Sequence, residues 1–227
     1  MVEHKKANEG MNVGEAVTQS EEFLIKNKKT IVAVIAVIIV VIAGMVMYHN
    51  FYAQPREEKA QVALFPGENY FRDGQYEYVL NGDSIGFEGL LKMTDQYSGT
   101  KAGKLAKAYI GLSYEQLGKN QEAIDALNSF NGKDLLVAPA LQGAIGNCYA
   151  RLGELDKATS HLLKAATGAD SDAISPIFLM QAGQIFETQG KYDDAIKAYT
   201  QVKDKYFRSY QAMDIDKYIE RATLLKK

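Results

Sequence analysis

The residues that could most readily do chemistry lie in two short glycine-containing segments. Residues 98–104, SGTKAGK, resemble a phosphate-binding loop, but the glycines lack the spacing of that loop and no Ser or Thr follows the second lysine. Residues 81–86, NGDSIG, place Asn81, Asp83 and Ser84 beside a glycine, as a calcium-binding loop does. The further acidic ligands and the closing glutamate of such a loop are missing from the sequence, so we expect a turn that leads into a helix.

Histidine and cysteine provide no obvious catalytic or metal-binding set. His4, His49 and His161 are far apart in the sequence, so none forms the i,i+4 pair that holds a metal on a helix. Cys148 is the only cysteine, which excludes an intramolecular disulfide and a cysteine metal cage, and we expect it to be buried and unreactive. Adjacent aspartates near the C-terminus fall on predicted solvated helix faces. The sequence therefore predicts a protein that is not an enzyme and has no cofactor and no metal site.

The charge composition limits the kinds of partner. The 227 residues carry 26 Lys and Arg against 28 Asp and Glu, a formal net charge of −2. A nucleic-acid surface needs a clustered excess of basic side chains. We therefore expect protein partners and no nucleic acid.

A long apolar segment near the N-terminus predicts a membrane anchor. Residues 31–47 are seventeen apolar residues without interruption, extended by Tyr48. Eighteen residues of helix are about 27 Å long, close to the thickness of the hydrocarbon core of a bilayer. A cleaved signal peptide is the alternative, but its leader would be thirty residues long and no small-x-small cleavage site follows the apolar run. We expect an uncleaved helix that contacts the bilayer through Ile31–Tyr48.

The flanking charges predict the orientation of this helix. Lys26, Lys28 and Lys29 lie directly before it, whereas Arg56 and Lys59 lie further away on the other side. Because Lys and Arg near the ends of a span stay in the cytoplasm, we expect a cytoplasmic N-terminus and a periplasmic C-terminal domain in a bacterial inner membrane.

The strongest pattern in the chain is a repeat. Residues 108–127, 143–162 and 180–199 each contain a glycine, an aromatic residue three positions later, a second glycine four further and an alanine five beyond that. The members are Gly111, Tyr114, Gly118 and Ala123; Gly146, Tyr149, Gly153 and Ala158; and Gly183, Phe186, Gly190 and Ala195. The first glycine and the alanine allow two antiparallel helices to approach closely, and the second glycine ends the first helix in a left-handed conformation.

This pattern resembles the tetratricopeptide repeat (TPR) family over about residues 104–203, without the family's initial Trp or its closing Pro. The resemblance implies an all-α fold, a solenoid of helical hairpins. An earlier segment with Gly67, Tyr70 and Gly74 at the same offsets resembles a degenerate first repeat, whose first helix Pro66 should kink or break.

The predicted organisation has five parts. These are a cytoplasmic tail (1–30), a transmembrane helix (31–50), one or more degenerate repeats (51–98), TPR repeats (99–206) and a capping helix (207–227). Within the tail, residues 14–29 have an amphipathic pattern that could lie along the lipid headgroups, or could simply lead into the anchor.

In this fold the first helices of successive repeats line a concave face, which is the predicted partner-binding groove. Its expected members are Leu105, Leu112, Gln116, Asn147, Arg151, Met180, Gln184 and Glu187. Mixed apolar and hydrogen-bonding side chains suit an extended peptide or a partner helix. Glu187 could instead pair with Arg151, and the face could also be plain solvated surface.

The whole layout is similar to the YfgM-like ancillary subunits of the bacterial Sec translocon, in their Bacteroidetes version. The shared elements are the SEEFLIKNKKT lead-in, the single span with aromatic residues at its exit, and the helical repeats after it. The resemblance implies an adaptor for protein export that contacts the SecYEG translocon, periplasmic chaperones or emerging chains. The alternative is a TPR scaffold for cell-wall, outer-membrane or secretion assemblies.

Overall fold

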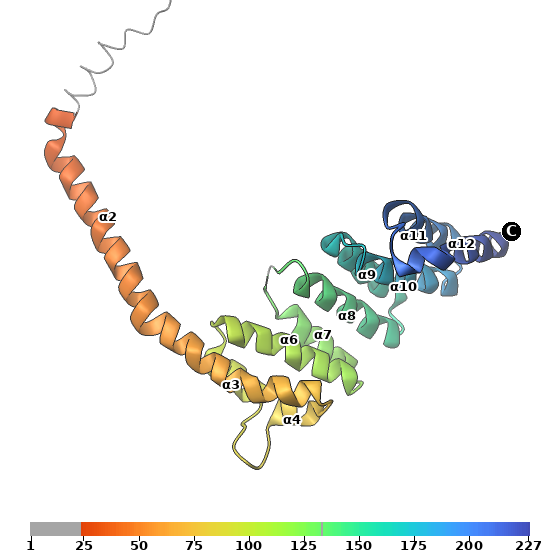
Figure 1. The fold of residues 1–227 in the computed structure, drawn as a ribbon, viewed down its shortest axis with the longest axis horizontal. Helices are drawn as coiled ribbons and strands as arrows, with labels where there is room; N and C mark the ends of the chain where they lie inside the picture. Colours follow the sequence, from red (N-terminus) through yellow and green to blue (C-terminus); the bar gives the residue numbers. More distant parts are fainter. Residues whose placement is uncertain (1–23, 133) are drawn as a thin grey trace, which may run out of the picture. The chain divides into compact units, whose positions relative to one another are not determined.

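The computed structural model describes residues 24–132 and 134–227, and the chain divides into two compact units, Met1–Pro55 and Arg56–Lys227. The predicted amphipathic pattern at residues 14–29 thus falls mostly outside the described residues. In the first unit, α2 (Lys28–Tyr48) is followed by one π-helical turn, His49–Ala53. None of the residues of α2 is buried, and its stretch of chain is long and apolar enough to cross a membrane (Figure 1).

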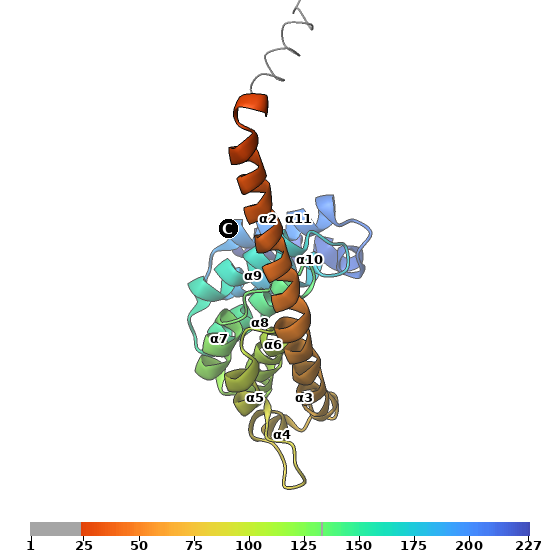
Figure 2. The same ribbon diagram turned by 90° about the vertical axis from the view of Figure 1, so that its left-hand side faces the viewer.

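The second unit is built from helices in hairpins, which confirms the all-α prediction for the described residues (Figures 1 and 2). The helices are α3 (Gln54–Arg72), α4 (Tyr76–Asn81), α5 (Leu90–Tyr97), α6 (Lys101–Gln116), α7 (Asn120–Asn128), α8 (Val137–Arg151), α9 (Leu155–Ala169), α10 (Ser175–Thr188), α11 (Tyr192–Lys205) and α12 (Ile215–Leu225), with a 3-10 turn at Tyr210–Asp214. Helix α6 packs on α7, α8 on α9 and α10 on α11, and α12 covers α11. The three repeats found in the sequence are therefore three consecutive helical hairpins.

The repeat glycines have the roles that the sequence predicts. A Cβ added at Gly111 would lie 2.5 Å from Cγ of Leu127, and one at Gly146 would lie 2.9 Å from Cγ of Leu162. Both distances are too short for a real contact, so these glycines allow the two helices of a hairpin to touch. The second glycine of each repeat has a positive φ, for example +74° at Gly118, which ends the first helix.

The N-terminal hairpin differs from the others because a loop divides its second helix into α4 and α5. Of the kink or break expected at Pro66, the break does not occur, because helix α3 is continuous through this residue. Gly67 meets Leu90, which would lie 2.6 Å from an added Cβ. Leu90 follows Gly67 by 23 positions, whereas Leu127 follows Gly111 by 16, so this hairpin contains seven additional residues (23 − 16). The segment between α4 and α5, residues 82–89, accommodates them as a loop that projects from the hairpin (Figures 1 and 2).

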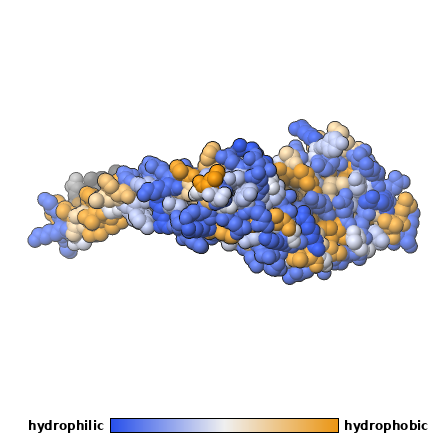
Figure 3. All heavy atoms as spheres, turned by 90° about the horizontal axis from the view of Figure 1, so that it is seen from below, coloured by the Kyte–Doolittle hydropathy of each residue, from blue (hydrophilic) through white to orange (hydrophobic). Residues whose placement is uncertain are grey.

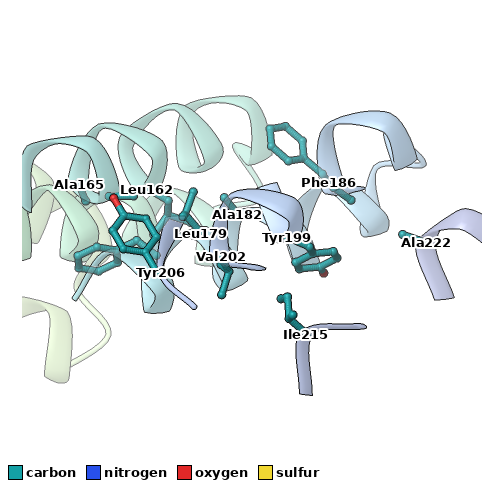
Figure 4. Packing of buried hydrophobic residues seen from close by; sticks show 13 residues of the cluster. Leu162, Ala165, Leu179, Ala182, Phe186, Tyr199, Val202, Tyr206, Ile215 and Ala222 are labelled. Carbon is teal, nitrogen blue, oxygen red and sulfur yellow. The ribbon is translucent and has the colours of Figure 1, made fainter. Parts of the chain in front are cut away.

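Three apolar clusters stabilise the second unit, one for each neighbourhood of hairpins. In the C-terminal cluster, the ring of Tyr199 and the side chain of Ile215 join α11 to the beginning of α12 (Figure 4). The repeat alanines Ala123, Ala158 and Ala195 are fully buried, as close helix packing requires. Each hairpin thus buries its apolar face against its neighbours, as in a solenoid.

Candidate functional site

The eight predicted groove residues lie on the first helices of the three repeat hairpins. Leu105, Leu112 and Gln116 belong to α6, Asn147 and Arg151 to α8, and Met180, Gln184 and Glu187 to α10. Leu105, Leu112 and Met180 are half-buried and pack against the apolar clusters, so part of each side chain stabilises the fold. Gln116, Arg151 and Gln184 are exposed.

The amide side chains of this surface form no hydrogen bonds with other side chains in the described part of the chain. Gln116, Asn147 and Gln184 form no side-chain hydrogen bond with another described residue, although each carries a donor and an acceptor group. An amide that is exposed and without a protein partner is hydrogen-bonded to water, which a partner's backbone replaces at little cost. Gln116 and Gln184 are exposed and Asn147 is half-buried, so these amides are available to hydrogen-bond an extended peptide.

Arg151 is engaged by Glu115, a residue that the sequence did not indicate as part of the site. The Nη1 atom of Arg151 donates to Oε1 of Glu115 at 3.2 Å, joining α8 to α6. The arginine side chain is 49% exposed, whereas the glutamate side chain is only 8% exposed. Burial raises the pKa of the Glu115 carboxyl, and the positive charge of Arg151 opposes that rise. Arg151 therefore compensates a buried carboxylate and is not a free cation.

The same environment keeps Cys148 in its thiol form. The side chain is fully buried, and burial together with the Glu115 charge raises the pKa of the thiol to about 11. Because the thiolate is the reactive form, the structure agrees with the expectation of an unreactive cysteine.

Glu187 pairs with Arg221 and not with Arg151, so the sequence-based alternative of a Glu187–Arg151 pair is wrong. The guanidinium of Arg221, in α12, donates to both carboxylate oxygens of Glu187, at 3.0 and 2.9 Å. The hydroxyl of Tyr199 donates to the same carboxylate at 2.7 Å. Burial and this hydrogen bond raise the pKa of Tyr199. Glu187 thereby ties α10 to α11 and α12.

The two ion pairs have a common origin in the repeat. Glu115 directly follows the repeat aromatic Tyr114, and Glu187 directly follows Phe186. Each glutamate binds an arginine of the next hairpin or helix, 36 and 34 residues later respectively. The position directly after the repeat aromatic is the sequence signal that could have identified these two carboxylates. Both of them are paired with an arginine, so neither is a free charge on this surface.

The segment that resembles a phosphate loop is the capped beginning of α6. Thr100 Oγ1 accepts a hydrogen bond from the Gly103 N–H at 2.9 Å. The carboxylate of Glu57, in α3, accepts the N–H groups of Lys101 and Ala102 at 2.6 and 2.9 Å. A helix N-terminus attracts anions, and here the protein's own carboxylate occupies that place. The geometry therefore leaves no anion site at this helix end.

The calcium-like turn is also internally satisfied. Oδ1 of Asp83 accepts the N–H groups of Ile85, Gly86 and Phe87 at 2.8 to 3.0 Å, and Oδ2 accepts the hydroxyl of Tyr70 at 2.6 Å. These bonds, above all the one from Tyr70, lower the pKa of Asp83 and keep it ionised. Its oxygens thus stabilise a turn.

The remaining titratable groups do not assemble into a metal centre within the described residues. Nδ1 of His161 lies 3.0 Å from Oε1 of Gln142, and the imidazole packs on the ring of Tyr149. Burial lowers the pKa of His161. His161 is accordingly a packed helix residue.

The fold defines a class of protein, the solenoids built from helical hairpins. Two family models, both described as tetratricopeptide repeat, match residues 109–174 and 178–206. The matched ranges cover the second half of α6 through α11, where the repeat glycines lie. No curated protein matches the sequence.

Proposed function

We propose that the protein is a membrane-anchored interaction adaptor that binds other proteins through the surface formed by α6, α8 and α10, and that it is not an enzyme. The observation that carries this proposal is the set of unengaged amides, Gln116, Asn147 and Gln184, on the first helices of three consecutive tetratricopeptide hairpins. Repeat surfaces of this kind bind extended peptides and helices because the scaffold positions several such groups in a row.

The anchoring part of the proposal rests on α2. Its exposed apolar side chains, among them Ile39 and Val40, are 60% and 70% exposed, which is costly in water and favourable in a bilayer. We place the N-terminus in the cytoplasm because of the lysines before the span, with the division into tail, span (31–50), degenerate repeat (51–98), repeats (99–206) and cap (207–227). A C-terminal alkaline phosphatase fusion should be active and a green fluorescent fusion dark; the reverse pattern would place the repeats in the cytosol.

Association with the Sec translocon, and with chaperones or exported chains in the periplasm, is the form of this function that the resemblance to YfgM-like subunits supports. A scaffold for cell-wall, outer-membrane or secretion machinery is the second candidate, since the same repeats and anchor would serve it equally well. The two differ in the identity of the partner alone.

Affinity purification of the full chain in mild detergent, followed by mass spectrometry, tests both candidates. The double variant Asn147→Ala with Gln184→Ala should lose the partner, because two unengaged amides are removed. The matched control, Asn128→Ala with Gln201→Ala, removes the same residue types from exposed positions of α7 and α11. Loss of the partner from the control, with recovery from the first variant unchanged, would move the binding surface to the second helices.

A further inference from the structure

The loop inserted between α4 and α5 has a defined conformation that is held by its own hydrogen bonds. Its ends, Gly82 and Gly89, both have positive φ (+83° and +85°) and lie so close together that a side chain on either would collide with the other strand of the loop. Inside the loop, Asp83 holds three backbone N–H groups, and its own N–H donates to the carbonyl of Phe87 at 2.8 Å. At the tip, Ile85 is 87% exposed. A compact loop whose ends lie close together is an Ω-loop, a type of loop that frequently carries function.

The loop forms one wall of a cleft of about 630 Å³, which α3 and α5 complete. The apolar side chains of its lining are Val62, Ala63, Pro66, Tyr70, Ile85, Phe87, Met93 and Tyr97. Its volume falls within the range of small-ligand pockets, about 300–1,000 Å³. Figure 3 shows the molecule from below, the side toward which the loop points in Figure 1. Hydrophobic residues lie among hydrophilic ones on this side. The cleft has the size and the lining for one large apolar side chain and its neighbours.

The charge of the cleft is negative. Asp73, Asp83 and Glu88 line it, and no Lys or Arg is among the described residues of its lining. Lys92 neutralises Glu88, whereas Asp73 has no ion-pair partner among the described residues and Asp83 is bound only by uncharged donors. The guanidinium of Arg56 donates to the backbone carbonyl of Gln96, a lining residue, at 2.6 Å. Asp73 and Asp83 therefore line the cleft without a cationic partner among the described residues, although both oxygens of Asp83 also accept hydrogen bonds within the turn.

The backbone of α3 adds a hydrogen-bond acceptor. Pro66 carries no N–H, so the carbonyl of Val62, one turn earlier, has no i+4 donor in the helix. Both residues line the cleft. A main-chain N–H of a bound peptide would satisfy this carbonyl.

We infer that the cleft between the 82–89 loop, α3 and α5 is a second protein-binding site, which takes an extended peptide with a large apolar side chain flanked by Lys or Arg. The site lies outside the residues matched by the tetratricopeptide models and is independent of the surface on α6, α8 and α10. The apolar lining holds the side chain, and Asp73 and Asp83 attract the flanking cations.

The absence of tryptophan from the chain gives a direct assay. The full chain in dodecyl maltoside micelles is titrated into acetyl-KKWLKK-amide, and the emission of the peptide's tryptophan is followed, with protein-free micelles as the blank. A blue shift that saturates is expected. The opposite-charge peptide acetyl-EEWLEE-amide should bind about tenfold or more weakly, and 0.5 M NaCl should weaken the cationic peptide severalfold.

Substitutions inside and outside the cleft test whether the cationic peptide binds there. Asp73→Lys should weaken the cationic peptide by about 3- to 10-fold, the range expected when an exposed attraction becomes a repulsion. Ile85→Ser should weaken it as well, at little cost to the fold because the side chain is solvent-exposed. The matched control Asp172→Lys, at an exposed position that does not line the cleft, should bind as the parent does. Asn147→Ala with Gln184→Ala should also leave this binding unchanged, which separates it from the adaptor proposal.

Three results would overturn the inference. They are no saturable shift up to millimolar protein, equal binding of the two peptides, and equal weakening by Asp73→Lys and Asp172→Lys.

Discussion

Substitution of Arg151 by glutamine separates a role in the fold from a role in partner binding. The sequence places Arg151 on the predicted groove, where its charge would be available to a partner. In the structure its guanidinium compensates Glu115, whose side chain is 8% exposed. Arg151→Gln therefore leaves a carboxylate uncompensated in a largely dry position and should destabilise the second unit.

The magnitude follows from the geometry. At the 3.2 Å separation of the ion pair, the Coulomb attraction is about 5 kcal/mol at an effective dielectric constant of about 20. Water screens the half-exposed arginine and part of this energy is offset by desolvation, so a net loss of about 2 kcal/mol is expected, below the cost of breaking a fully buried pair. For a unit of this size, that corresponds to a Tm lowered by about 4–8 °C.

Substitution of the partner residue, Glu115, should have a much smaller effect on stability. Because burial raises the pKa of Glu115 in spite of Arg151, the ionised carboxylate is on balance less favourable in the fold than in water. Glu115→Gln removes that charge and leaves a half-exposed, hydrated arginine. It should change Tm by less than about 2 °C, in either direction.

The effect of Arg151→Gln should also depend on pH. Glu115 has a folded pKa above its ordinary value of 4.5, so the cost of its ionised form is fully present above the folded pKa and absent below 4.5. Loss of Arg151 raises the folded pKa further. The Tm difference between variant and parent should therefore be largest near pH 7 and shrink as the pH falls toward 4.5.

Circular dichroism at 222 nm on the full chain in detergent, between pH 4.5 and 7.5, measures these effects. The account of the ion pair would be refuted if Arg151→Gln melted with the parent at pH 7, or if Glu115→Gln lost as much stability as Arg151→Gln.

Three further outcomes are expected. Glu57→Ala, which removes the carboxylate at the beginning of α6, should cost about 1 kcal/mol and lower Tm by ~2–4 °C; an unchanged melt would mean that water replaces the cap. Ala158→Leu should cost about 1–3 kcal/mol because Ala158 is fully buried, whereas Ala140→Leu at an exposed position of the same hairpin should cost little; equal melts would show that the contact tolerates a larger side chain. Cys148 should react with a maleimide at pH 7.5 only after unfolding, since the native thiol is buried with a pKa of about 11; fast native labelling, followed by mass spectrometry, would contradict its burial.

The repeat was predictable because its residues act locally. Gly118, Gly153 and Gly190 end helices within their own hairpin, and a positive φ leaves glycine as the natural choice there. Glycines that let two helices touch are set by the 16-residue distance to their partner, which recurs in all three repeats. Such short-range requirements leave a period in the sequence.

What the sequence did not reveal depends on contacts between distant residues. Glu57 caps a helix that begins 44 residues later, and Arg151 binds a glutamate 36 residues earlier. Many carboxylates precede each of these partners, so charge alone did not identify the pair. Leu90 reaches Gly67 only because seven inserted residues form a loop, and the uninterrupted spacing of the other repeats gave no indication of that shift.

Site-specific photo-cross-linking of the full chain in intact membranes shows which helices of the repeats contact a partner. A benzoylphenylalanine is placed at Gln116 or Gln184 on the first helices, or at Gln201 on α11 as the control; all three positions are exposed. The adaptor account predicts a discrete protein adduct from Gln116 and Gln184 and none from Gln201, with the same partner identified by mass spectrometry at both positions. A discrete adduct from Gln201 alone would contradict it.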